Sequence, residues 1–166
     1  LVEDVHFSRK FSSPYQHGYK SAMVNISDVC ASGAKPLYLT VSLSLPDDID
    51  GEFIKEFYKG MSAACNGVEI AGGDITGSDK IYISVTAIGS DAGRKISSRK
   101  NAKVGQKIIV SGEHGASGAG LKLLFEGRNE PEKFIKAHLM PEAQLSFSEE
   151  IALHQKTDYA MMDTSD

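Results

Sequence analysis

Four aspartates lie on or at the ends of elements that the sequence predicts, where carboxylates can hold a metal ion. They are Asp28 in NISD, Asp74 after two glycines, and Asp163 and Asp166 in MDTSD. Taken singly, each is also explained as a solvated or capping residue. Taken together they indicate a divalent cation, because Mg²⁺ prefers a few carboxylate oxygens together with water and phosphate oxygens.

The stretch EIAGGD predicts a strand that ends in two glycines and an aspartate. Gly73 has no Cβ, so its backbone can come close to a ligand. Asp74 would then present its carboxylate at the strand end, where α/β proteins usually bind ligands. The alternative is a tight turn in which Asp74 accepts hydrogen bonds from backbone amides.

Other residues are compatible with phosphate binding without requiring it. Arg99 in SSRKNA can donate two parallel hydrogen bonds to a phosphate, although an arginine in a polar segment is commonly a surface residue. The stretch GEHGASGAG matches neither the Walker pattern nor G-x-G-x-x-G, so a tight strand-to-helix connection explains it as well. His6 beside Phe7, and Tyr58 on a helical stripe, fit ordinary packing.

The pattern of apolar residues predicts an α/β fold in two parts. In the first part, apolar residues at helical spacing predict helices at 16–32 and 49–65. Period-two alternation and short apolar runs predict strands at 37–45, 68–74 and 80–89.

A polar and basic segment, 93–103, has no apolar period and predicts a linker between an N-terminal domain, 1–95, and a second domain, 104–166. In the second domain we expect the start of another α/β unit. Its expected elements are strands at 106–112 and 159–163 and helices ending near Gly127, at 131–138 and at 142–155. Because the chain begins without methionine and stops at MMDTSD, we expect a piece of a longer protein.

Composition narrows the class of protein. The 166 residues include 22 acidic and 18 basic side chains, for a net charge of −4, which argues against a nucleic-acid binder with its usual basic patch. No apolar run approaches the ~20 residues that span a bilayer. The two cysteines do not form a disulfide framework. We therefore expect a cytoplasmic protein that binds neither nucleic acid nor membrane.

Read in order, the motifs LVEDVHF, NISDVCASGAKP, GGDITGSDK, SRKNAKVGQ and MMDTSD resemble those of the thiamine-monophosphate kinase family. That family belongs to the superfamily of aminoimidazole ribonucleotide synthetase and selenophosphate synthetase. The resemblance covers nearly the whole chain and is weakest over 128–156. It implies transfer of the γ-phosphoryl group of ATP to thiamine monophosphate. It also implies an N-terminal domain that forms a homodimer through its sheet, and a second domain that closes over the nucleotide.

The resemblance implies roles for individual residues. The implied Mg²⁺ ligands are Asp28, Asp74, Asp163 and Asp166. The implied ATP-site residues are Tyr58, Gly73, Arg99 and Ser165, and His6 would touch the substrate. No catalytic acid or base is expected, because a phosphate monoester with a second pKa of about 6 is already anionic at neutral pH. Positioning and charge neutralisation by Mg²⁺ would carry the reaction.

Three positions depart from the family pattern. Asp4 stands where the family usually has glycine, Ala31-Ser32 replaces an alanine-methionine pair, and Gln106 replaces a common aspartate. None removes a metal ligand, but Asp4 beside His6 can alter the contact with substrate. Two alternatives stay open: another ATP-dependent member such as selenophosphate synthetase, and a non-catalytic module that binds a nucleotide or metal.

Overall fold

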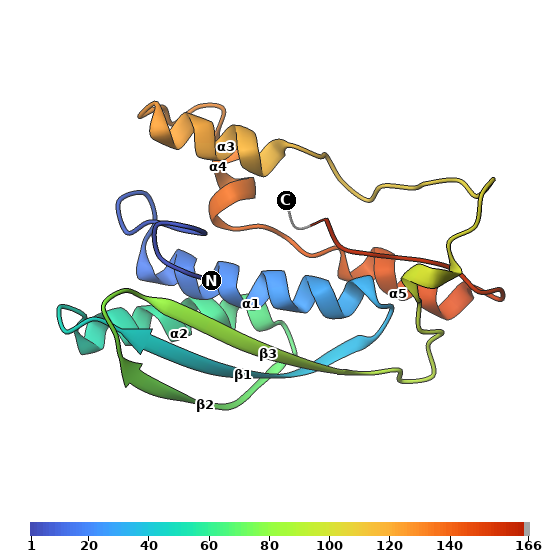
Figure 1. The fold of residues 1–166 in the computed structure, drawn as a ribbon, viewed down its shortest axis with the longest axis horizontal. Coiled ribbons are helices and arrows are strands. Elements are labelled where there is room, and N and C mark those ends of the chain that lie inside the picture. Colours follow the sequence, from blue (N-terminus) through green and yellow to red (C-terminus); the bar gives the residue numbers. More distant parts are fainter. Residues whose placement is uncertain (165–166) are drawn as a thin grey trace.

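The computed structural model describes residues 1–164, which are built on a three-stranded mixed sheet. The central strand runs parallel to one neighbour and antiparallel to the other, in the order β2-β1-β3. Two helices cover one face of this sheet (Figure 1). The bounds are β1 Lys35–Leu45, β2 Glu69–Gly77, β3 Tyr82–Ser90, α1 Pro14–Ala31 and α2 Gly51–Cys65. The expected mixed α/β fold and these five elements are confirmed.

The two helices cross so closely that each needs a glycine at the crossing. A Cβ on Gly18 would overlap the backbone carbonyl of Phe57, and a Cβ on Gly60 would overlap that of Tyr15. Both helices begin at a polar side chain, Ser13 for α1 and Asp50 for α2, which accepts a hydrogen bond from an amide of the first turn. The crossing fixes α1 across the sheet.

The core lies between the sheet and these helices. Alternate residues of β1 point toward the helices and are buried with Ile26, Phe57 and Met61; these strand residues are Leu39, Val41, Leu43 and Leu45. The residues between them, such as Ser42, lie on the other face, which no helix of the described residues covers. The period-two alternation therefore identified both faces of the strand correctly.

The second half of the described chain contributes helices. They are η1 Arg99–Asn101, α3 Ala116–Phe125, α4 Glu132–Leu139 and α5 Leu145–His154. Helix α3 packs against α4, while α4 and α5 contact α1 on the side away from the sheet. The predicted helices at 131–138 and 142–155 are thus confirmed to within a few residues. None of the helices in residues 1–164 is both long and apolar enough to cross a lipid bilayer.

The two strands predicted in this half, 106–112 and 159–163, are wrong. A strand needs a neighbour that pairs with its backbone, and within the described residues neither segment has one. Ile108 is 93% exposed and Ile109 is 74% exposed, in an extended segment. Tyr159 is buried, but through contacts with the 95–101 segment rather than with a sheet.

The predicted linker, 93–103, is bound to the end of α1 and to α5. The amide of Ser97 donates to the carbonyl of Ser32 at 2.8 Å, and the amide of Lys95 donates to the carbonyl of Ala152 at 2.9 Å. The division into domains 1–95 and 104–166 stays a prediction.

Candidate functional site

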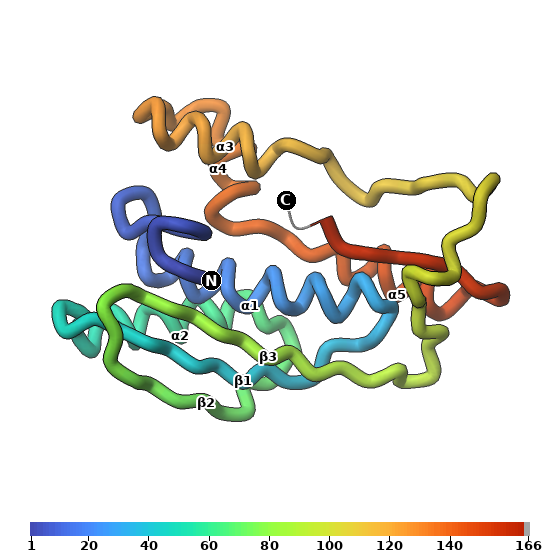
Figure 2. Tube along the Cα trace, in the orientation of Figure 1, coloured from blue at the N-terminus to red at the C-terminus, as the bar shows by residue number. Residues whose placement is uncertain are grey.

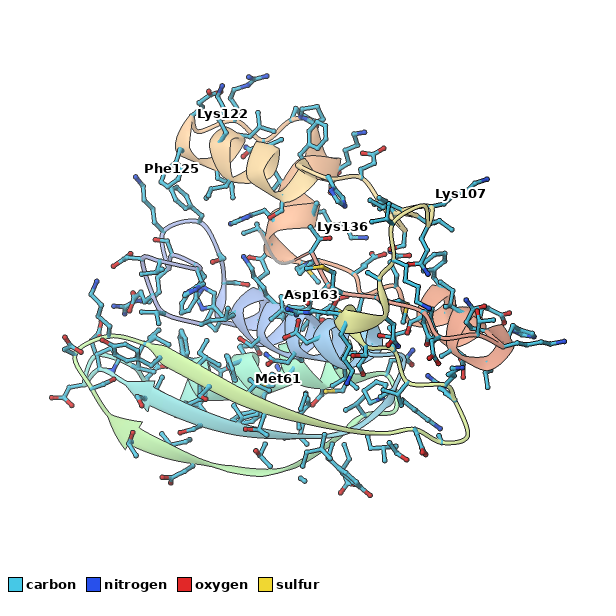
Figure 3. The ribbon with its side chains drawn as sticks, turned by 45° about the vertical axis from the view of Figure 1, so that its right-hand side comes forward. Met61, Lys107, Lys122, Phe125, Lys136 and Asp163 are labelled. Atoms are coloured by element: carbon cyan, nitrogen blue, oxygen red, sulfur yellow. The ribbon has the colours of Figure 1, made fainter. Side chains whose placement is uncertain are left out.

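An acidic pair forms where the end of the described chain returns to α1. Figure 2 shows the segment after α5 turning back and running over α1, and Figure 3 shows Asp163 above that helix. Partial burial, and then the charge of Asp163, raises the pKa of the Asp28 carboxyl. Arg99 lies beside the pair, with its Nη2 3.7 Å from Oδ1 of Asp163. Three residues predicted to serve one site are therefore brought together.

This pair suits a hard divalent cation. A carboxylate whose charged form is disfavoured by burial and by a second carboxylate, as Asp28 is, is stabilised by a cation between the two, and carboxylate oxygens are what Mg²⁺ prefers. Within residues 1–164, no group of three or more His, Cys, Asp or Glu side chains lies close enough to hold a metal ion. Asp166 and Ser165, the other predicted residues of this segment, lie outside the described residues.

Asp74 lies elsewhere. It is in the middle of β2 rather than at a strand end, because β2 continues to Gly77. It pairs with Ser42, whose neighbours in β1 point toward the helices, so Asp74 faces the uncovered side of the sheet. Asp28 lies on α1, on the opposite side. Serving one Mg²⁺ site requires the carboxylates of Asp28 and Asp74 to converge, and a single chain does not bring them together; the metal role of Asp74 stays a prediction.

The glycine pair before Asp74 has a structural explanation. The pairing of β2 with β1 shifts register between Leu39 and Thr40, where Gly72 adopts φ 156°. A Cβ on Gly73 would overlap the carbonyl oxygen of Val41. Close strand pairing thus requires Gly73 in any case, and its role toward ATP stays a prediction.

Tyr58, the fourth residue predicted for the ATP site, lies on α2. Its ring meets that of Phe57 edge to face, with centroids 5.4 Å apart and planes at 87°. Burial raises the pKa of its phenol. Its surroundings agree with the packing interpretation, and its nucleotide contact stays a prediction.

A pocket of about 230 Å³ lies at the other end of α1 and includes His6. Loop 4–12, the first turns of α1, and helices α3 and α4 form its walls. Aromatic rings contribute much of the lining, from Phe7, Phe11 and Phe125. The rings of Phe11 and Phe125 meet edge to face at 5.2 Å and join the loop to α3.

Two histidines of this pocket escaped the sequence analysis. Burial, the largest cause, lowers the pKa of His17 to about 4 and that of His138 to about 4. Each ring lies beside a serine hydroxyl: Ser12 at 2.7 Å for His17, and Ser117 at 3.0 Å for His138. Because residues far apart in sequence enclose both rings, helical spacing alone identified neither. Both are neutral at pH 7.

Together with Lys10, Lys20 gives the pocket its positive charge. Its Nζ donates to the carbonyl of His6 at 3.1 Å, and burial lowers its pKa. Among the described residues, no carboxylate oxygen lies within 4.0 Å of this ammonium. Eight residues separate Lys20 from Asp28 on α1, which at 1.5 Å per residue is about 12 Å along the helix. One helix thus connects an aromatic pocket containing a cation with an acidic pair.

Relatives of known name match the chain over its whole length. It is 39% identical to thiamine-monophosphate kinase of Aquifex aeolicus and 37% identical to that of Bacillus subtilis; each alignment covers all of this chain, and 54% and 53% of the relative. A solved structure described as AaThiL complexed with AMPPCP and TMP superposes with a TM-score of 0.90. It is 37% identical, and the match covers all of this chain and 54% of that one. The chain spans about half the length of the curated relatives it matches.

The N-terminal sheet and α1, which carry Asp28, Lys20 and the pocket loop, lie in a segment that has its own family assignment. Residues 1–90 of the 166 match the family described as AIR synthase related protein, N-terminal domain. That match covers more than half of the chain, and the named relatives align with all of it. The chain therefore belongs to the AIR synthase related family.

Proposed function

We propose that this protein, in its full length, transfers the γ-phosphoryl group of ATP to thiamine monophosphate. The observation that carries the proposal is the arrangement along α1: an aromatic pocket with a half-buried ammonium at one end and an acidic pair about 12 Å further along. This distance suits an acceptor whose ring system occupies the pocket and whose phosphate extends toward the acidic pair. The relative solved with AMPPCP and TMP supports the same pair of ligands.

The pocket is assigned to the acceptor. Rings of Phe7, Phe11 and Phe125 offer faces and edges to a flat heteroaromatic group. His6 lies in the pocket wall, and this position supports the contact with substrate that the resemblance implies. The two neutral histidines can donate or accept hydrogen bonds without adding charge. The ammonium of Lys20 is assigned to the phosphate of the acceptor, whose negative charge it offsets.

The acidic pair is assigned to Mg²⁺ and the triphosphate. Asp28 and Asp163 would hold Mg²⁺ together with Asp166, and Asp74 would be the further ligand that the resemblance implies. When bound, Mg²⁺ neutralises charge on the phosphates as the two polyanions approach. Arg99, which lies beside Asp163, can donate to phosphate oxygens, with Ser165, Gly73 and Tyr58 as further ATP contacts. No side chain needs to remove a proton, because the acceptor phosphate is anionic at neutral pH.

The uncovered face of the sheet is assigned to a homodimer. Tyr38, Tyr82 and Ile88 are 41%, 39% and 48% exposed on this side of the domain, among serine and threonine side chains. A sheet with one apolar face open to water is stabilised by packing on another layer. Asp74 lies on this face, so the partner subunit would come close to it.

A cytoplasmic location is part of the same proposal. Cys30 and Cys65 are both buried and free, as expected of a protein from a reducing compartment.

Turnover by the full-length protein tests the proposal. Consumption of Mg²⁺-ATP and formation of the phosphorylated product are measured with thiamine monophosphate, with thiamine and with selenide as acceptors. We expect thiamine diphosphate to form only with thiamine monophosphate and only with Mg²⁺. Turnover with selenide instead would favour selenophosphate synthetase, and ATP binding without turnover on any acceptor would favour a non-catalytic module.

A further inference from the structure

Tyr159 is fixed at three points to the segment that carries Arg99. Its side chain is 7% exposed. Its hydroxyl donates to the carbonyl of Lys95 at 2.5 Å. Its own carbonyl accepts from the amide of Ser98 at 3.4 Å and from Nδ2 of Asn101 at 3.3 Å. Both the backbone and the side chain of Tyr159 are thus hydrogen-bonded to the 95–101 segment.

A glycine at the end of α1 makes room for the hydroxyl. Gly33 has φ +83°, and a Cβ added there would lie 2.7 Å from Oη of Tyr159 and 3.3 Å from Cβ of Ala152. The end of α1, the 95–101 segment and α5 therefore form the socket for the Tyr159 ring. Asp28 lies near the end of α1, and Arg99 lies in the 95–101 segment, so the socket is built from the elements that carry both residues.

Beyond Tyr159 the chain is held more weakly. Met162 is 65% exposed, and no hydrogen bond to another described residue fixes the backbone from 160 to 164. Asp163 follows Tyr159 by four residues, a tether of roughly 14 Å at most. Tyr159 is the last well-fixed point before Asp163.

We propose that Tyr159 is a positioning residue for the acidic pair: its socket at Gly33 sets where Asp163 meets Asp28 and Arg99. This inference rests on the proposed function, in which Asp163 binds the metal. Tyr159 touches neither substrate nor metal itself and acts through the chain that it anchors. Lys95 also pairs with Asp158 at 3.1 Å, so loss of the hydroxyl alone leaves the segment docked but less precisely fixed.

The test uses Tyr159→Phe in the full-length protein, with Mn²⁺ binding followed by its paramagnetic resonance signal and amide exchange measured over 160–164. Losing one buried hydrogen bond should weaken Mn²⁺ binding by about threefold to tenfold and accelerate exchange in this segment. Gly33→Ala should act in the same direction, because its Cβ displaces the hydroxyl and because φ +83° strains any residue other than glycine. The part of the effect that comes from the hydroxyl should be absent in the Tyr159→Phe background.

Tyr15→Phe on α1 serves as the matched control and should leave Mn²⁺ affinity unchanged. Asp163→Asn separates two failures. If Asp163→Asn weakens Mn²⁺ binding and Tyr159→Phe alters neither binding nor exchange, the anchoring role is refuted while the proposed function stands. If Asp163→Asn leaves Mn²⁺ affinity unchanged, the metal assignment fails, and the positioning role fails with it.

Discussion

Replacing His17 by glutamine should remove much of the acid sensitivity of this fold. His17 is 2% exposed, and burial is the main cause that lowers its pKa from 6.5 to about 4, with Arg9 and Lys20 adding in the same direction and Glu3 opposing them. Between pH 4 and 6.5 the unfolded chain therefore binds a proton that the folded chain does not. The free energy of unfolding must rise with pH through this window.

The magnitude follows from the difference between the two pKa values. About 2.5 pH units at 1.36 kcal/mol each correspond to roughly 3 kcal/mol, present in full above pH 6.5 and lost as the pH falls to 4. That is a large part of the stability of an ordinary domain. His138 has a pKa lowered to about 4 as well, so it adds to the loss in the same direction.

The pH dependence of the free energy of unfolding is measured by urea unfolding at several pH values from 4 to 7.5. The proteins compared are the wild type, His17→Gln and His154→Gln. His154 is exposed on α5, so its variant should follow the wild type. His17→Gln should be less stable at pH 7 but should lose less stability on acidification. The reasoning is refuted if the pH slopes of His17→Gln and the wild type coincide, or if the ring titrates near pH 6.5 by NMR in the folded protein.

The remaining predictions concern the site and the sheet. Asp28→Asn should lower kcat by about 100-fold or more. Its thermal stability should be kept or raised, because the raised pKa of Asp28 means that its charge opposes folding. A stable variant with full turnover would exclude a metal role. Asp74→Asn should cost a similar factor without unfolding, because its side chain is exposed, and an unfolded variant with normal activity per folded molecule would support a purely structural role. Lys20→Met should weaken thiamine monophosphate binding about tenfold or more but leave thiamine binding unchanged; equal losses for both in calorimetry would contradict the assignment to the phosphate. Ile88→Asp should convert a dimer to a monomer in light scattering, and a wild type that is already monomeric at micromolar concentration would contradict the proposed interface.

The sequence was sufficient for the helices and strands whose partners are close along the chain. The alternation in LYLTVSLSL identified both faces of β1, and the stripe from Phe53 to Ala64 identified α2, because one buried face imposes a period on the residues that form it. The same reasoning failed for 106–112 and 159–163. Their composition suits a strand, but a strand exists only where another backbone pairs with it.

The same distinction between local pattern and tertiary contact applies to the candidate site. Motif order led to the prediction that Asp28, Asp163 and His6 belong to one family site, and their roles there stay predictions. Only the tertiary structure decided that Asp163 returns to Asp28 while Asp74 faces the other side of the sheet. It alone revealed that Lys20, His17 and His138 share a pocket. These contacts join residues that are far apart in sequence, and burial, which sets the pKa values of the two histidines, depends on every element that surrounds them.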